Sequence, residues 1–201
     1  MPERITDELL LKKAGDGDQA AFLELYERYR APIFRFAYRL LGSVEVAEDV
    51  THDCFLSLIR KPENFRQELA SLKTYLYAAA RNLALKHFRN QGRETALDEV
   101  TEEPKDSPRR GPLRRLLDEE LATHVKEAVF SLPPLQREAL ILFEYEGLSL
   151  SEIAEITGAD VGAVKGRLFR ARERLKSILR PYVNSGQELN TGREIVTLRE
   201  A

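Results

Sequence analysis

Hydrophobic residues recur along this chain at helical spacing, and no stretch alternates apolar and polar positions as a β-strand does. The pattern predicts a helix that begins near Ala20, a second that opens at Pro32, and a third that Ser43 caps and Pro62 stops. A fourth, alanine-rich helix is expected over residues 72–88. The sequence therefore predicts an all-α protein.

The composition divides the chain into four parts. Residues 1–91 are expected to form a first small helical domain, and residues 113–183 a second. Between them, residues 92–112 combine glycine, proline and clustered acids, which predicts a flexible acidic linker. The polar tail at 184–201 has no role that the sequence reveals.

The second domain contains the pattern of a helix-turn-helix. Ser149 or Ser151 is placed to cap a short first helix, Gly158 permits the positive φ of a tight turn, and Asp160 is placed to cap a second helix. That second helix has an apolar stripe on one side and basic residues off the stripe. This arrangement is typical of a motif that docks in the major groove of DNA. The expected stripe consists of Val161, Val164, Leu168, Ala171 and Leu175.

The charge of this second helix favours DNA over a merely solvated surface. Residues 160–180 carry seven basic residues against two acidic ones, whereas a solvated helix face more often mixes the two signs. Phe169 also lies off the stripe among the bases.

The whole chain is not basic, since its 201 residues carry a formal net charge of −2, so any nucleic-acid surface must be local. Cys54 is the single cysteine, which excludes an internal disulfide, and its helical spacing predicts a buried side chain rather than a reactive thiol. No apolar run suits a membrane span and no secretion signal is recognisable, so we expect a cytoplasmic protein without membrane insertion.

An acidic segment in the first domain has two interpretations. Glu45, Glu48, Asp49 and Asp53 fall on one predicted helix. Acids near a helix N-terminus are favourable in themselves, so this could be an ordinary solvated face. The alternative is a docking surface for a basic partner.

The helix that ends near residue 90 is basic. Arg81, Lys86, Arg89 and Arg93 have no acid between them, and several aromatic residues lie nearby in sequence. Some of these rings must belong to the core, but bases interleaved with aromatics also suit single-stranded nucleic acid.

Nothing in the sequence indicates catalysis. His52, His87 and His124 are not at zinc-ligand spacings, and no metalloprotease or phosphate-loop motif occurs. A nucleic-acid enzyme is therefore disfavoured, and we expect no catalytic residues, metal or cofactor.

Four motifs in order resemble the extracytoplasmic-function branch of the sigma-70 family, which supplies promoter-recognition subunits to bacterial RNA polymerase. The resemblance rests on four segments. They are the opening segment at 18–26, the segment Ala47-Glu-Asp-Val-Thr-His-Asp-Cys-Phe-Leu56, the segment 72–89, and Leu132-Pro-Pro-Leu-Gln-Arg-Glu-Ala-Leu140 with the helix-turn-helix that follows it. It covers about residues 10–180.

The resemblance implies core RNA polymerase and promoter DNA as partners, and an anti-sigma factor as regulator. It implies polymerase contacts from Glu48, Asp49, His52 and Asp53, and recognition of the minus-ten promoter element by Tyr75, Asn82, Lys86 and Arg89. The minus-thirty-five element would be read by Lys165, Gly166, Phe169 and Arg170 at base edges, while Arg167, Arg172 and Arg174 hold phosphates.

This sequence departs from the family's usual residues at a few of these positions. The family usually has Gln at the position of His52, often Trp at Tyr75, commonly Asp at Lys86 and often Ser at Gly166. We expect the changes at Lys86 and Gly166 to alter which promoter is read.

The rival interpretation, a free-standing helix-turn-helix repressor or activator, would account for residues 113–182 only.

Overall fold

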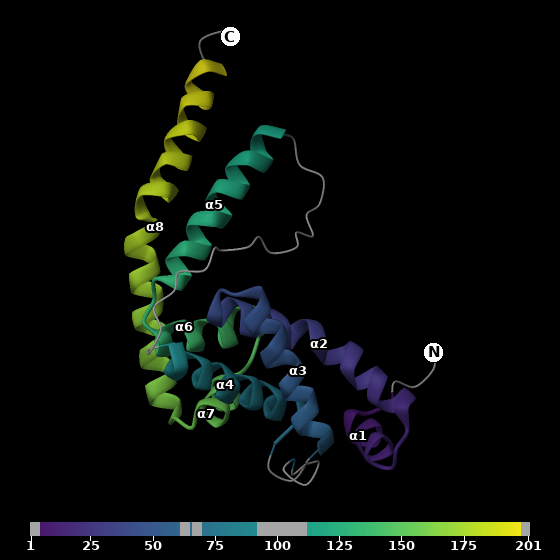
Figure 1. The fold of residues 1–201 in the computed structure, drawn as a ribbon. Helices are drawn as coiled ribbons and strands as arrows, with labels where there is room; N and C mark the ends of the chain where they lie inside the picture. The colour runs from purple at the N-terminus through teal and green to yellow at the C-terminus, as the bar shows by residue number, and fades with distance from the viewer. Residues whose placement is uncertain (1–4, 61–64, 66–69, 92–111, 198–201) are drawn as a thin grey trace. The chain divides into compact units, whose positions relative to one another are not determined.

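A computed structural model describes residues 5–60, 65, 70–91 and 112–197 of the chain. Within these residues every regular element is helical (Figure 1), so the expected all-α fold is confirmed. The expected linker at 92–112 lies, except for its last residue, outside the described residues. None of the described helices is long and apolar enough to cross a membrane.

Most of the described helices are joined by connections of a few residues. In chain order they are α1 (Asp7–Gly15), α2 (Gln19–Leu41), α3 (Val44–Arg60), α4 (Leu72–Gln91), α5 (Pro112–Phe130), α6 (Pro134–Leu140), the π-helical turn η2 (Ile141–Tyr145), α7 (Leu150–Thr157) and α8 (Val161–Thr197).

The chain forms two compact units, which are described separately. The first comprises residues 1–103 and 141–164, and the second comprises residues 104–140 and 165–201. Helices α1 to α4 therefore share a unit with η2, α7 and the first turn of α8. This grouping differs from the order along the sequence, because residues 141–164 join the N-terminal helices.

The core of the first unit lies where α2, α3 and α4 pack on one another. Fully buried side chains from each helix meet there, and the ring of Phe36 lies edge-on to that of Tyr77 at a centroid distance of 5.4 Å. Helix α7 packs on α4, and η2 packs on α2 and α7. The buried residues Leu148, Ile153 and Ile156 anchor this part.

Helix α2 begins at Gln19 and runs unbroken through Pro32, so the prediction that Pro32 opens a separate helix was wrong. A proline inside a helix removes one backbone hydrogen bond and normally disfavours the helix. Here Ile33, Phe36 and Ala37, all fully buried, follow it directly. Burial of the helix on the core therefore outweighs the local preference of proline.

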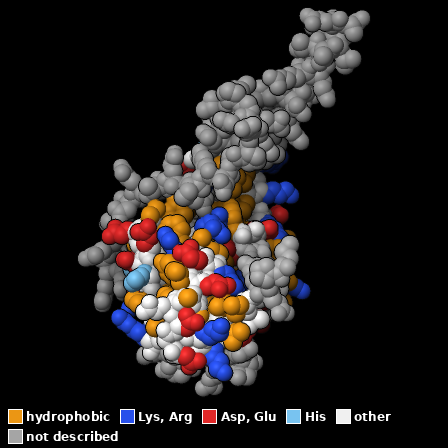
Figure 2. Space-filling model, turned by 90° about the vertical axis from the view of Figure 1, so that its right-hand side faces the viewer, with side chains coloured by type: hydrophobic (Ala, Val, Ile, Leu, Met, Phe, Trp, Pro, Cys, Tyr) orange, Lys and Arg blue, Asp and Glu red, His pale blue; other side chains and the backbone are white. Residues whose placement is uncertain are grey.

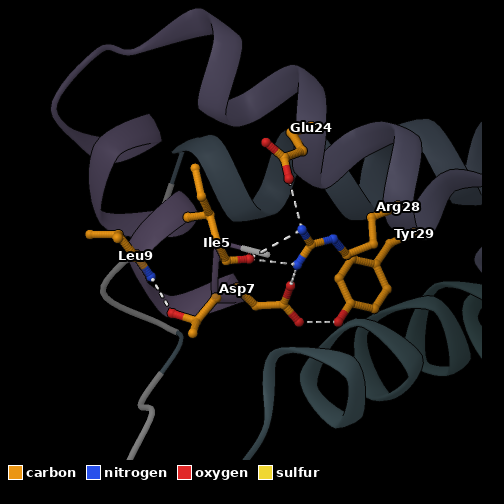
Figure 3. A network of polar contacts seen from close by, with 7 residues as sticks. Ile5, Asp7, Leu9, Glu24, Arg28 and Tyr29 are labelled. Atoms are coloured by element: carbon orange, nitrogen blue, oxygen red, sulfur yellow. Dashed lines mark hydrogen bonds and ion pairs between the residues drawn. The ribbon is translucent and has the colours of Figure 1, made fainter. Parts of the chain in front are cut away.

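A polar cluster holds α1 against α2 (Figure 3). The Arg28 guanidinium donates to the carboxylate of Asp7, to the Ile5 carbonyl oxygen at 3.2 Å and to Glu24 at 2.8 Å. The Tyr29 hydroxyl donates to the second oxygen of the same Asp7 carboxylate. This cluster was not predicted, because its members are about 20 residues apart in sequence.

Cys54 lies in the core of α3, as the sequence predicted. Its thiol donates to the carbonyl oxygen of Leu76 at 3.4 Å. Burial raises the pKa of this thiol to about 12, which keeps it protonated and poorly nucleophilic.

The second unit contains α5, α6 and most of α8. Pro134 occupies the first position of α6, where a proline is tolerated, and the preceding Leu132 is buried. The imidazole of His124 stacks on the Tyr182 ring at 3.9 Å, which joins α5 to α8. Helix α8 continues to Thr197, so most of the expected tail at 184–201 has a helical backbone.

Candidate nucleic-acid and protein interfaces

Helix α7, the turn after it and the start of α8 form the predicted helix-turn-helix. The Ser149 hydroxyl accepts from the Glu152 backbone N–H at 3.2 Å, and the Glu152 carboxylate accepts from the Ser149 N–H at 2.8 Å. This reciprocal pair is a capping box and selects Ser149, not Ser151, as the cap. Gly158 has φ of 65°, and Asp160 accepts from the Ala163 N–H at 2.7 Å.

Most of the bases on α8 face solvent. Val164, Leu168 and Ala171 are buried, as the apolar stripe predicts. Phe169 is 67 % exposed, so its ring is available for a contact. The exposed candidate residues of α8 are Lys165, Phe169, Arg170, Arg172 and Arg174.

Three positions on α8 differ from the predicted pattern. Val161, placed in the apolar stripe, is 36 % exposed, and Leu175 at its other end is only half-buried. Arg167 is half-buried, and its Nη1 atom is shielded from solvent with no hydrogen-bond partner among the described residues. Its side chain is therefore less available to a phosphate than those of Arg172 and Arg174.

Helix α4 presents the candidate minus-ten residues at helical spacing. Asn82 and Lys86 are exposed, while Tyr75 is half-buried with its ring edge-on to Phe65 at 5.5 Å. Positions 75, 82, 86 and 89 are separated by seven, four and three residues, which places them on one side of a helix. The side chain of Arg89 lies outside the described residues.

Helix α3 separates an acidic exposed side from a buried side. Glu48, Asp49, His52 and Asp53 are all exposed, whereas Val50, Cys54 and Leu58 on the other side are buried. Ile59 is 51 % exposed and lies seven residues after His52, hence on the acidic side. Sequence analysis did not single out Ile59, although its spacing from His52 could have identified it.

One face of the molecule carries side chains of both signs. Figure 2 shows one face of the molecule, on which acidic, basic and hydrophobic side chains are interspersed rather than gathered by sign. Among the described residues, no group of three or more His, Cys, Asp or Glu side chains is arranged to hold a metal ion.

Two family descriptions match the chain in the order of its motifs. Sigma-70 region 2 matches residues 25–94, and sigma-70 region 4 matches residues 125–175. The first match includes α3 and α4, and the second includes the helix-turn-helix.

Curated proteins resemble the chain over nearly its whole length. The ECF RNA polymerase sigma-E factor of Haemophilus influenzae is 32 % identical over 191 residues, which covers 91 % of this chain and 100 % of that protein. The sigma-E factor of Escherichia coli is 34 % identical, with coverages of 91 % and 99 %. The RNA polymerase sigma-H factor of Pseudomonas aeruginosa is 33 % identical, with coverages of 88 % and 95 %.

Two solved structures share the fold. The sigma factor RpoE of Bartonella quintana, in complex with the anti-sigma factor NepR, has a TM-score of 0.66 at 27 % identity and covers 79 % of this chain and 96 % of its own. CnrH, in complex with the cytosolic domain of CnrY, has a TM-score of 0.64 at 26 % identity, with coverages of 87 % and 97 %.

Proposed function

This chain belongs to the extracytoplasmic-function sigma factors of the sigma-70 family, and we propose that its three exposed surfaces divide the work of promoter-specific initiation among them. The observation that carries the proposal is the capped helix-turn-helix whose second helix exposes Lys165, Phe169 and Arg170 to solvent. Residues 1–91 are the polymerase-docking and minus-ten domain, residues 92–112 the linker, and residues 113–183 the minus-thirty-five domain.

The acidic side of α3 docks on core RNA polymerase. Glu48, Asp49, His52 and Asp53 are exposed on a helix whose other side is buried, so they are free of a structural task in the core. Charge complementarity of this kind steers association and selects the partner. Ile59 adds exposed apolar area, which a partner would remove from water.

Helix α8 reads the minus-thirty-five element. In this proposal Lys165 and Arg170 donate to guanine, and Phe169 contacts a thymine methyl group. Arg172 and Arg174 hold phosphates, with Arg167 nearer the core of the motif. Gly166 has no side chain, so the helix backbone is uncovered between these residues.

Helix α4 recognises the minus-ten element as it opens. Its exposed Asn82 and Lys86, the Tyr75 ring and Arg89 lie at spacings that suit an unstacked strand. Extrusion of a base costs a few kcal/mol, so contacts from this helix must offset that cost.

The remaining properties follow from this assignment. The polymerase performs the chemistry, so the chain itself holds no catalytic residue or cofactor and works in the cytoplasm. An anti-sigma factor is the expected regulator, because the similar RpoE and CnrH structures are complexes with NepR and with CnrY.

Co-purification with core RNA polymerase tests the proposal against the rival repressor. The full chain should retain core polymerase at salt concentrations near physiological. Binding of core polymerase supports a sigma factor, whereas absence of binding together with tight specific binding to duplex DNA would favour the repressor.

A further inference from the structure

Glu173 is an acidic residue on a basic stretch of helix. It is the only Asp or Glu among residues 161–182 of α8, and basic residues stand on both sides of it in the sequence. The residue is exposed, and no hydrogen bond or ion pair reaches it from any of the described residues. Its carboxylate is therefore available to a partner from outside the chain.

The basic residues within reach of Glu173 do not neutralise it. Side chains three or four residues apart on a helix can pair, and Arg170 and Lys176 each stand three residues away. The Arg170 guanidinium, however, folds back over Gly166, one turn earlier on the helix. Lys176 forms no ion pair with Glu173 either. An acid that could pair within its own helix thus remains unpaired.

Glu173 lies on the side of α8 that is opposite the core. At about 100° per residue, it is about 140° and 200° around the helix from the buried Leu168 and Ala171. Gly166, Phe169 and Glu173 are spaced by three and four residues, which places them on one side of the helix. Glu173 therefore continues, by one turn, the side on which Phe169 is a proposed base contact.

The spacing along the helix axis keeps Glu173 close to the bases that Phe169 would contact. A helix rises about 1.5 Å per residue, so Glu173 is about 6 Å beyond Phe169 along α8. Successive base pairs are about 3.4 Å apart, so this rise is less than two base-pair steps. The major groove, about 12 Å wide, admits a helix, so the next turn after Phe169 still faces base edges.

A carboxylate in the major groove discriminates between bases by its chemistry. It can only accept hydrogen bonds, and cytosine is the base that presents a donor there, its N4 amino group, without an acceptor. Guanine and thymine present acceptors, which repel a carboxylate. The phosphates repel it as well, so a site without cytosine offers nothing that offsets this repulsion.

We propose that Glu173 is a further specificity-determining residue of α8, which accepts a hydrogen bond from the N4 amino group of a cytosine in the minus-thirty-five element. The inference rests on the proposed function, because it requires α8 to lie in the major groove of promoter DNA. Glu173 selects by repulsion as well as attraction. Lys165 and Arg170 differ from it, because their charge favours any DNA.

Selection from a promoter library that is randomised across the minus-thirty-five element tests this assignment, with the full chain bound to core polymerase. The wild type should favour cytosine at one position about fivefold or more over the other bases. Glu173→Gln should lose that preference and favour adenine there, because a glutamine amide pairs with adenine N6 and N7. Glu173→Ala should lose the preference for cytosine without gaining another.

Two further variants locate the selected cytosine along the DNA. The position that changes in Phe169→Ala should lie within two base pairs of the cytosine, and the position that changes in Lys165→Ala should lie farther away on the same side. The control Glu155→Gln removes the same charge from an exposed position of α7 and should leave every base preference unchanged.

Cytosine selection that persists in both Glu173 variants would overturn the assignment. An equal rise in affinity for every sequence would overturn it too, because the acid would then act through its charge alone. If the wild-type complex selected no element at all, the proposed function would fail together with this inference, so the two failures are distinguishable. Residue 173 is exposed, so neither substitution disturbs the core.

Discussion

The guanidinium of Arg170 lies against the bare backbone of Gly166, one helical turn earlier on α8. A Cβ atom added at Gly166 would come within 3.3 Å of Arg170 Nη1 and 3.8 Å of its Cζ. Long side chains on a helix point back toward its N-terminus, which brings residue i+4 over residue i. The missing side chain of Gly166 thus sets where a candidate base-reading group can lie.

We predict that Gly166→Ala stabilises the fold but changes promoter preference. Glycine inside a helix costs about 0.5–1 kcal/mol relative to alanine, so the free energy of unfolding should rise. The new methyl group displaces the Arg170 guanidinium and should change the preferred base at one position of the minus-thirty-five element. Selection from a randomised promoter library measures this. In an Arg170→Ala background the same substitution should leave base preference unchanged, and a persisting shift would disprove the coupling.

Substitutions of base-reading residues on α8 should affect DNA binding differently from substitutions of phosphate-holding residues. Lys165→Ala or Arg170→Ala should cost about 1–3 kcal/mol at the preferred promoter and relax base preference there. Arg174→Ala should weaken binding evenly across sequences and flatten its dependence on salt. Binding titrations at several salt concentrations measure both effects. Equal losses at every promoter in all three variants would refute the division.

Charge reversal on α3 should abolish polymerase binding without unfolding the protein. Asp49→Lys with Asp53→Lys changes two exposed acids, which contribute little to stability. Against a complementary basic surface the same reversal is strongly unfavourable. Glu27→Lys with Glu155→Lys provides a control with the same charge change at exposed positions elsewhere. Affinity for core polymerase that stays unchanged in the Asp49 and Asp53 variant would show that the acidic side is merely solvated.

The capping box should make part of the stability depend on pH. Hydrogen bonds from Ser149 lower the pKa of Glu152 below its ordinary value. A lowered pKa in the folded state contributes stability at neutral pH, and this contribution is lost as pH falls from about 4.3 through the folded-state pKa. Ser149→Ala should cost about 1 kcal/mol at pH 7.

Urea unfolding over this pH range measures the effect. The stability of Glu152→Gln should fall less steeply in acid than that of the wild type, because glutamine does not titrate. Identical slopes for the two proteins would contradict the role of the Glu152 carboxylate.

Local features of the fold were predictable because their causes lie within one helical turn. The Asp160 cap, the positive φ of Gly158 and the two-sided character of α3 each depend on residues a few positions apart. The prediction that Pro32 begins a helix was wrong, because burial of the residues after it outweighs the tendency of proline to interrupt a helix. A local pattern contains no information on that burial.

Long-range polar contacts could not be predicted from the sequence. Arg39 and Glu146 are 107 residues apart. In the sequence alone, each resembles an ordinary solvated charge. The same holds for Arg28 and Asp7, which are 21 residues apart. Only the packing of α1, η2 and α7 on their neighbours brings these charges together.

Run-off transcription with purified core polymerase and a genomic promoter library tests the central claim most directly. We predict discrete start sites that require both core polymerase and this chain, and that disappear when the Asp49→Lys and Asp53→Lys variant replaces the wild type. Transcripts whose start sites are the same with core polymerase alone, or undiminished with that variant, would contradict the account of this chain as a promoter-specificity factor that docks through α3.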